Sequence, residues 1–392
     1  MTTDQPILIA GGGIGGLAAA LGLARKGLPS AVFEKASKFS EIGAGIQIAP
    51  NAFNCFDALG VGDAIRAIAI YIDKIRLMDG ISGKEIFNIP LDQPFREHFG
   101  NPYAVVHRAD LHTILLNACR ENPLIDLNAA SSAVRYEQAD GEVVLHLEGK
   151  PPIKGRALIG ADGLHSAIRA QLIGDSSPRV SGHTTYRSVI PTEQMPEDLR
   201  WNAATLWAGP KFHVVHYPLK GGKVFNLVVT YHNDVTETVA GEPATDEEVL
   251  RGFGAGHASV RRIIEHGQDW KRWVLCDRDP NENWIDGHVT LLGDAAHPML
   301  QYWAQGACMA LEDAVCLSGA IASHDTIDAA FTAYHHARFA RTAQVQLGSR
   351  AIGDYIYHPS AGSAAARNAI LGAKTAADWF QTLDWLYGYR AD

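Results

Sequence analysis

Six residues near the start of the chain constrain its fold more than any other feature. Gly11, Gly13 and Gly16 form a G-x-G-x-x-G pattern between a short apolar run, residues 7–10, and an Ala- and Leu-rich stretch, residues 17–26. In a strand–turn–helix unit the first glycine permits a tight turn, the second lets backbone approach a pyrophosphate, and the third lets the helix pack on the strand. This context predicts a Rossmann-type β–α–β unit that binds a dinucleotide.

The residues after the second predicted strand agree with this interpretation. Residues 31–33 have the pattern of a buried strand, and Glu34 and Lys35 follow it. A carboxylate at this position accepts hydrogen bonds from ribose hydroxyls, and the N-terminus of the preceding helix attracts the pyrophosphate. We therefore predict that Glu34 and Lys35 lie in the cofactor site. The pattern by itself leaves both FAD and NAD open.

Composition excludes several classes of protein. Of the 392 residues, 47% are hydrophobic, as in a globular protein with a sizeable core, and the formal net charge is −9 without any basic tract. Nucleic-acid binding therefore has no electrostatic support. The five cysteines are scattered and lack a CxxC pair, which argues against a disulfide framework and against a metal site, and favours a cytoplasmic protein. Residues 1–6 have the character of neither a signal peptide nor a membrane span.

The pattern of apolar residues changes along the chain. Buried-strand and helix patterns occur at the start, in the middle and late in the sequence, whereas short alternating segments around residues 212–217 and 224–231 flank a Lys220–Lys223 turn. We predict an α/β fold with a Rossmann-type cofactor domain that is discontinuous in sequence, an inserted antiparallel-sheet substrate domain and a helical C-terminal region. The predicted ranges are 1–71, 105–177 and 285–350 for the first, 72–104 and 178–284 for the second, and 351–392 for the third.

Two later segments each place an acidic turn after a buried strand. Residues 160–169 read GADGLHSAIR, and residues 293–298 read GDAAHP. Parallel strands end at a common edge, where ligands bind, so we expect Asp162 and Asp294 to converge with the glycine turn.

Together these three turns resemble the fingerprints of the class A flavoprotein aromatic hydroxylases, the group that contains 4-hydroxybenzoate and salicylate hydroxylases. The order and spacing of the turns cover nearly the whole chain. The resemblance implies that the dinucleotide is FAD, with Asp294 at its ribityl chain and the backbone of Gly306 and Ala307 near the flavin ring. It also implies that Arg108 reaches the cofactor and that the segment 162–169 serves both FAD and the nicotinamide.

A second glycine fingerprint, expected of a reductase with two dinucleotide domains, is absent from the sequence. In the family, the nicotinamide binds transiently in a cleft without its own Rossmann unit. The resemblance therefore implies NADH as co-substrate, with NADPH as the alternative, O2 as oxidant, a flavin C4a-hydroperoxide as oxygen donor, and a homodimer.

The substrate end is predicted from one strand and one later run. His213 and Tyr217, at i and i+4, project from the same face of an alternating strand, and taken alone they fit ordinary packing. This strand and residues 297–302 resemble those of the gentisate-forming family members that act on 3-hydroxybenzoate. That resemblance implies His213 as the base for the phenol, Gln301 as its hydrogen-bonding neighbour and a substrate contact, and Tyr217 as a contact to the substrate carboxylate.

The chemistry suits those residue types. Electrophilic attack on a ring is favoured ortho and para to a phenolate, and a neutral histidine with an ordinary pKa of about 6.5 accepts a phenolic proton near neutral pH. In 3-hydroxybenzoate the para carbon is C6, so the product would be 2,5-dihydroxybenzoate (gentisate).

Several alternatives remain open from the sequence. Salicylate hydroxylase and 6-hydroxynicotinate 3-monooxygenase use the same machinery, although Gln301, in place of a histidine after Met299-Leu300, weighs against the second. A non-hydroxylating FAD-binding reductase and an NAD dehydrogenase are alternatives of another class. Residues 276–280 fit either a cleft border or a buried ion pair, and the aromatic tail, residues 384–389, fits packing on the body or on a partner subunit.

Overall fold

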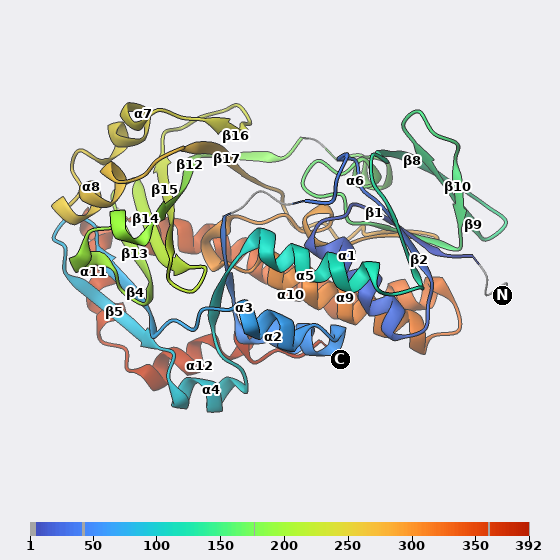
Figure 1. Cartoon of the computed structure of the whole chain (residues 1–392), viewed down its shortest axis with the longest axis horizontal. Helices are drawn as coiled ribbons and strands as arrows, with labels where there is room; N and C mark the ends of the chain where they lie inside the picture. The colour runs from blue at the N-terminus through green and yellow to red at the C-terminus, as the bar shows by residue number, and fades with distance from the viewer. Residues whose placement is uncertain (1–4, 41–43, 176, 360, 392) are drawn as a thin grey trace.

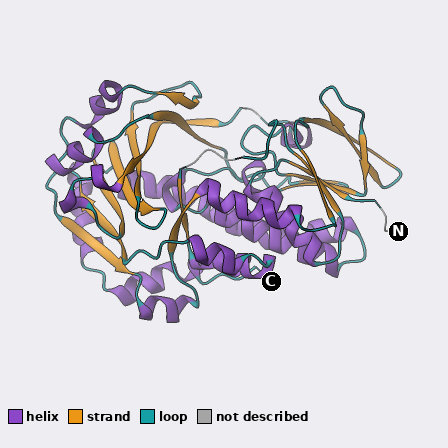
Figure 2. Cartoon of the chain, viewed as in Figure 1, coloured by secondary structure: helices purple, strands orange, loops and turns teal. Residues whose placement is uncertain are grey.

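Two β-sheets with a layer of long helices between them form the framework of the protein (Figures 1 and 2). The computed structural model describes residues 5–40, 44–175, 177–359 and 361–391. The expectation about the N-terminus therefore falls mostly on residues 1–4, outside the described part of the chain. The mixed α/β class that the sequence predicts is confirmed.

The first sheet, at the right of Figure 1, has the strand order β18-β19-β11-β1-β2-β7. All neighbours pair in parallel except β18 and β19. Three central strands are buried along their whole length, because helices and loops cover both faces of a parallel sheet. The strands are β1 (Ile7–Ala10), β2 (Ser30–Phe33), β7 (Ile125–Asn128), β11 (Ala157–Gly160), β18 (Ile285–Asp286) and β19 (Val289–Leu291).

The second sheet, at the left of Figure 1, has eight strands in the order β16-β17-β12-β15-β14-β13-β4-β5. Every neighbouring pair is antiparallel except β13 and β4, so two segments distant in sequence build one sheet. One face packs on a separate apolar cluster that includes Trp207, Phe212 and Leu227. The strands are β4 (Lys74–Asp79), β5 (Glu85–Pro90), β12 (Arg179–Pro191), β13 (Ala203–Gly209), β14 (Phe212–Leu219), β15 (Val224–His232), β16 (Ala240–Pro243) and β17 (Lys271–Asp277).

Two smaller sheets complete the strands. The antiparallel strands β8 (Ala133–Ala139), β9 (Glu142–Leu147) and β10 (Ile153–Gly155) lie at the right end of Figure 1. Strands β3 (Gly45–Ile48) and β6 (Ala104–His107) form a pair that reaches the second large sheet, where the Gly45 backbone N–H donates to Asn226 Oδ1 at 2.8 Å.

Helix α9 is the centre of the helical layer and contacts α1, α2 and α10. By length and composition alone it would be apolar enough to cross a membrane, but 67% of its apolar window is buried inside the protein, as in a core helix. The described helices are α1 (Ile14–Arg25), α2 (Pro50–Leu59), α3 (Gly62–Ile68), α4 (Gln93–Phe99), α5 (Arg108–Arg120), α6 (Ala167–Ile173), α7 (Asp246–Leu250), α8 (Ala258–Glu265), α9 (Gly306–Ser323), α10 (Ile327–Ile352), α11 (Ala361–Gly372) and α12 (Ala376–Tyr387).

A fully buried ion cluster joins α9 to α10. The Arg338 guanidinium donates to Glu312 Oε2 at 2.6 Å and to Asp313 Oδ1 at 2.7 Å, and none of the three side chains is exposed. Asp313 also accepts from the Gly293 backbone N–H at 3.0 Å and contacts His297 Nε2 at 2.5 Å. Although burial raises its pKa, the nearby His297 and Arg338 outweigh that effect and lower the pKa of Asp313 to about 2. The cluster therefore fixes the turn after β19 to the helical core.

The structure shows the contacts of two segments whose roles the sequence left open. The buried Asp277 carboxylate pairs with two partly exposed arginines, Arg179 at 2.8 Å and Arg350 at 2.7 Å, and Cys276 beside it borders the large cavity described below. The aromatic tail packs on the body of the same chain, where the Arg341 guanidinium lies 3.9 Å from the centre of the Tyr389 ring.

We expect Arg338→Met to lower the free energy of unfolding by about 3–5 kcal/mol, because it removes the buried cation that Glu312 and Asp313 share and leaves Glu312 with Arg341 alone. Urea unfolding followed by tryptophan fluorescence measures the loss. Arg262→Met is the matched control, since its partner Asp198 is exposed, and it should cost less than about 1 kcal/mol. Equal losses in the two variants would contradict the role given to the cluster.

Candidate active site

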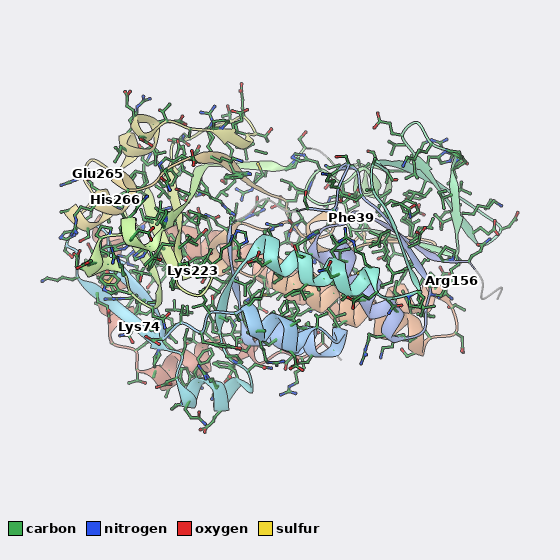
Figure 3. The ribbon with its side chains drawn as sticks, in the orientation of Figure 1. Phe39, Lys74, Arg156, Lys223, Glu265 and His266 are labelled. Carbon is green, nitrogen blue, oxygen red and sulfur yellow. The ribbon has the colours of Figure 1, made fainter. Side chains whose placement is uncertain are left out.

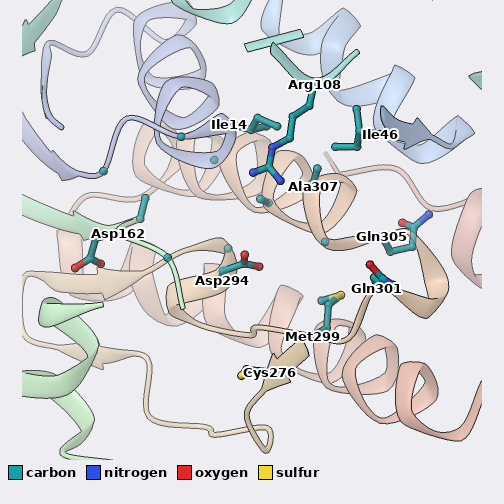
Figure 4. A pocket seen from close by; sticks show the side chains of 18 of the residues that line it. Ile14, Ile46, Arg108, Asp162, Cys276, Asp294, Met299, Gln301, Gln305 and Ala307 are labelled. Carbon is teal, nitrogen blue, oxygen red and sulfur yellow. The ribbon is translucent and has the colours of Figure 1, made fainter. Parts of the chain in front are cut away.

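A large cavity of about 640 Å³ lies between the two large sheets (Figure 4). At one end it is bordered by the turns after β1, β2, β11 and β19 and by the first residues of α1, α5 and α9. At the other end it is bordered by β12, β14 and β15. Every site residue predicted from the sequence lines this cavity except Gly16, which supports its glycine turn.

The glycine turn has the geometry that the pattern predicts. Gly11 has φ +108°, and a Cβ there would lie 2.3 Å from the carbonyl oxygen of Ala161 in the neighbouring turn. A Cβ at Gly16 would lie 2.0 Å from the carbonyl oxygen of Gly11, so the start of α1 approaches the turn as closely as backbone permits. Phe39, labelled in Figure 3, lies over Gly12. Gly13 precedes α1 and borders the cavity.

Glu34 is held at the edge of the cavity by two backbone groups. Its Oε2 accepts from the Gly12 N–H and its Oε1 from the Ala36 N–H, both at 2.8 Å. Each oxygen keeps a lone pair for a further donor, as a ribose hydroxyl would supply. Lys35 also lines the cavity beside it.

The Asp162 carboxylate supports its own turn. It accepts from the Ala167 N–H at 2.8 Å and from the Ser166 hydroxyl, and so caps the N-terminus of α6. Burial raises the pKa of Asp162 despite these hydrogen bonds. Arg169, on the same helix, donates to the carbonyl oxygens of Ala295 and Ala296 at 2.9 and 2.7 Å. The segment 162–169 thus connects the turn after β11 to the turn after β19.

The start of α9 and two charged residues enclose the middle of the cavity. Figure 4 shows Arg108 reaching in between Ile14 and Ala307, with Asp294 on the opposite side. A Cβ at Gly306 would meet nothing within 4 Å, so that glycine borders open space. The N-termini of α1 and α9 both face the cavity, and each brings partial positive charge and free N–H groups. These features fit an anionic dinucleotide with a planar ring system at α9.

Three adjacent strands form the floor of the other end of the cavity. Their register aligns residues of one sheet face in three rows across β12, β15 and β14, and five of these residues line the cavity: Arg187, His213, Val215, Tyr217 and Val228. His213 and Tyr217 lie on this one face, as predicted, with Val215 between them. The rows are Thr185, Thr230 and His213; Arg187, Val228 and Val215; and Val189, Asn226 and Tyr217.

The His213 ring is buried and its Nδ1 lies 2.8 Å from His358 Nε2. That hydrogen bond leaves Nε2 as the ring nitrogen available to a ligand in the cavity. Burial, reinforced by His358 and His183, lowers the pKa of His213 well below the ordinary value, so the imidazole is neutral near pH 7. Tyr357 lies with its ring centre 4.7 Å from that of His213 and closes the same wall.

Gln301 makes different contacts from those the resemblance implies. Its Nε2 donates to Thr185 Oγ1 at 3.1 Å and to Thr230 Oγ1 at 3.2 Å, and its Oε1 accepts from Arg187 at 3.1 Å. Within the described residues no hydrogen bond joins Gln301 to His213, and His358 is the neighbour of His213 instead. The expected hydrogen bond between Gln301 and His213 is therefore wrong. The Gln301 amide bonds instead to the hydroxyls of Thr185 and Thr230 and to Arg187.

Sequence reasoning missed three residues of this end of the cavity. Tyr357 ends the π-helix Gly353–Tyr357 that follows α10, His358 comes directly after it, and no local pattern connects them with β14. Arg187 had a signal, because it is a cation at a cavity-facing position of a strand whose neighbours are mostly buried. His216, on the opposite face of β14, accepts from Trp207 Nε1 at 3.2 Å and serves packing.

The described residues contain no cluster of histidine, cysteine or acidic side chains that would hold a metal ion. All five cysteines are free thiols. Burial raises the pKa of Tyr217, so its hydroxyl remains a hydrogen-bond donor.

Comparisons with known proteins agree with this site. The family described as FAD binding domain matches residues 4–348. The 3-hydroxybenzoate 6-hydroxylase 1 of Aquipseudomonas alcaligenes is 55% identical over 97% of each chain, and the 3-hydroxybenzoate 6-hydroxylase of Polaromonas naphthalenivorans is 45% identical over 99% of this chain and 96% of that relative. The structure of Klebsiella pneumoniae HpxO complexed with FAD and uric acid matches with a TM-score of 0.86 at 25% identity, over 97% of this chain and 96% of that one. The chain therefore belongs to the class A FAD-dependent aromatic hydroxylases, and it is an FAD-dependent aromatic monooxygenase.

Proposed function

We propose that the enzyme catalyses the para-hydroxylation of 3-hydroxybenzoate to 2,5-dihydroxybenzoate, using O2 and a reduced nicotinamide. The observation that carries this proposal is a neutral, buried His213 whose free ring nitrogen faces a cavity that continues to the glycine turn. The names of two relatives, 55% and 45% identical over nearly the whole chain, support the choice of acid.

FAD would occupy the cavity with its pyrophosphate at Gly11, Gly13 and the N-terminus of α1, where Gly16 permits the close approach. Glu34 would accept from ribose hydroxyls, with Lys35 beside it. The flavin end would lie among a further set of cavity residues, namely Arg108, Asp162, Asp294, Gly306 and Ala307. When bound, FAD supplies the redox chemistry that takes hydride from the nicotinamide and activates O2.

The protein's own part in the reaction is proton removal and positioning. Nε2 of His213 would accept the phenolic proton of the substrate, while the hydrogen bond between His213 Nδ1 and His358 Nε2 fixes the orientation of the imidazole. The resulting phenolate raises electron density at the para carbon. Tyr357 and Tyr302, whose ring centres lie 4.7 and 5.6 Å from that of His213, surround the base with aromatic surface and exclude water.

We also infer the division of the chain. Residues 1–71, 105–177 and 285–350 would form the FAD-binding domain, 72–104 and 178–284 the substrate-binding domain, and 351–392 the C-terminal helical region. The single eight-stranded sheet built from β4, β5 and β12 to β17 supports the second assignment. NADH, with NADPH as the alternative, would bind transiently in the open cleft, and the enzyme would work as a cytoplasmic homodimer.

Product analysis tests the substrate. With FAD and NADH, we expect 3-hydroxybenzoate to give 2,5-dihydroxybenzoate in an amount equal to the NADH consumed, and salicylate and 6-hydroxynicotinate to give little product. Chromatography of the three reactions measures this. Oxygenation of another acid in preference would replace the substrate assignment, and NADH oxidation without oxygenated product from 3-hydroxybenzoate would exclude that acid as the substrate.

For Glu34→Ala we expect the dissociation constant of FAD to rise about 10- to 100-fold, because a hydrogen bond to a charged group contributes roughly 1.5–3 kcal/mol. Fluorescence titration of the apoprotein measures it. Glu142→Ala, which removes an exposed carboxylate on β9, is the control and should bind FAD like the wild type. Unchanged FAD affinity in Glu34→Ala would exclude the ribose role.

For His213→Ala we expect hydroxylation at pH 7 to slow about 10²- to 10⁴-fold, the usual contribution of a positioned base. The rate should recover partly as the pH approaches about 10, the ordinary pKa of a phenol, because the substrate then ionises by itself. Stopped-flow rates with FAD bound across this range are the measurement, and His216→Ala serves as the control histidine on the opposite face. A wild-type rate at pH 7 would rule out the base.

The lowered pKa of His213 determines the acid side of the pH profile. Because burial and the neighbouring histidines His358 and His183 disfavour the protonated imidazole, the base stays neutral to a lower pH than usual. We expect kcat/KM of the wild type to remain high as the pH falls through about 6.5, the ordinary value for histidine, and to decline only below it. A midpoint at or above that value would show that the imidazole is not desolvated in the free enzyme.

A further inference from the structure

Arg187 is a cation in the substrate end of the cavity without an anionic partner. It lies on β12 and lines the cavity, and its partial exposure opens onto that cavity. In the described part of the chain, its side chain makes one hydrogen bond, to Gln301 Oε1, and no ion pair with a carboxylate, and its guanidinium lies 5.5 Å from the centre of the Trp273 ring, which carries no negative charge. Nε is buried without a partner.

Charge and burial at Arg187 call for an anion. Burial lowers the pKa of the Arg187 guanidinium. The nearby cation Arg108 lowers it as well, whereas Tyr217 raises it. A guanidinium has five N–H donors, and leaving them unpaired away from water is unfavourable. Arg338, by contrast, is satisfied by two carboxylates of the protein itself. A bound anion is therefore the partner that the fold does not supply.

The position of Arg187 relative to His213 matches a benzoate that carries a hydroxyl group. The two residues lie on strands two apart and in adjacent rows, so their Cα atoms are separated by about 12 Å from the spacing and rise of strands. Val228 and Val215 lie in the row of Arg187 and provide an apolar surface for a ring. A base at one end, an apolar strip, and a cation at the other end complement a phenol, a ring and a carboxylate.

Gln301 determines where the guanidinium lies. Its amide nitrogen is tied to Thr185 and Thr230, and its carbonyl oxygen holds Arg187 Nη2. The amide therefore orients the cation without neutralising it, which a carboxylate at the same position would do.

We propose that Arg187, positioned by Gln301, binds the carboxylate of the aromatic acid substrate. The proposal rests on the proposed function, in that the substrate is a hydroxybenzoate, and it makes Gln301 a positioning residue for substrate recognition. Tyr217, two rows from His213 on the same face, donates a second hydrogen bond to the carboxylate. Holding both ends of the ring decides which carbon faces the flavin.

Binding of matched acids and amides to the holoenzyme tests the proposal. Absorbance titration of bound FAD gives dissociation constants for 3-hydroxybenzoate and for neutral 3-hydroxybenzamide, which differ at the carboxylate only. In Arg187→Met we expect the constant for the acid to rise about 10- to 100-fold, as expected on losing charge-assisted hydrogen bonds, and that for the amide to change little. Arg187→Lys, which keeps the charge, should lose acid affinity to a smaller extent. Arg272→Met, on the same sheet but facing away from the cavity and paired with Glu242 and Glu248, should match the wild type.

The variant Gln301→Glu distinguishes a positioning role of Gln301 from a merely structural one. Its carboxylate would pair with Arg187, so acid affinity should fall while amide affinity is retained. The proposal would be overturned if Arg187→Met changed the dissociation constants of the acid and the amide equally, or changed neither. It would also be overturned if the wild type bound no hydroxybenzoate more tightly than the corresponding amide. If the wild type instead prefers salicylate or 4-hydroxybenzoate, and Arg187→Met abolishes that preference, the proposal stands and the assigned substrate is wrong.

Discussion

The close approach of three turns at one edge of the parallel sheet governs the rest of the structure. The turn after β1 passes so near the turn after β11 that a single methyl group at Gly11 would collide with the Ala161 carbonyl oxygen. Arg169 links the turn after β11 to the one after β19, and Asp313 binds that last turn to the buried ion cluster. These contacts hold the three turns close together, and as a result the N-termini of α1 and α9 both face a common cavity.

The antiparallel sheet contributes chemistry that the parallel sheet lacks. Alternation along β12, β15 and β14 sends one set of side chains into an apolar cluster and the other set into the cavity. Strand β3 keeps this floor in place beside the cofactor end, since the Gly45 N–H bonds to Asn226 and a Cβ there would strike Tyr217. His213 and Arg187 thus face one cavity from the same side of a single sheet.

Local patterns predicted most of the framework and the cofactor end of the site. The strand at residues 7–10, the helix that follows the glycine turn, and the side shared by His213 and Tyr217 all follow from apolar periodicity and turn chemistry. The pairing of His213 with His358 does not follow from local patterns, because His358 lies 145 residues away and reaches His213 through tertiary packing alone. Gln301 was placed in the correct cavity but with the wrong partner, since the direction of its amide depends on two threonines from different strands. Arg187 was missed because an isolated strand does not reveal that its cation has no acidic partner.

The π-helix that follows α10 affects how the size of the cavity can change among related enzymes. Helix α10 is about 39 Å long at the usual rise per residue and is held to the core through Arg338, and the π-helix beyond its far end places Tyr357 and His358 beside His213. An insertion or deletion of one residue within α10 would rotate the rings of Tyr357 and His358 away from the cavity. The wider π-helical turn, in contrast, accommodates one extra residue at the point where the two rings leave the helix. Related enzymes built for bulkier acids would therefore be expected to differ at this turn, and to keep α10 itself at constant length.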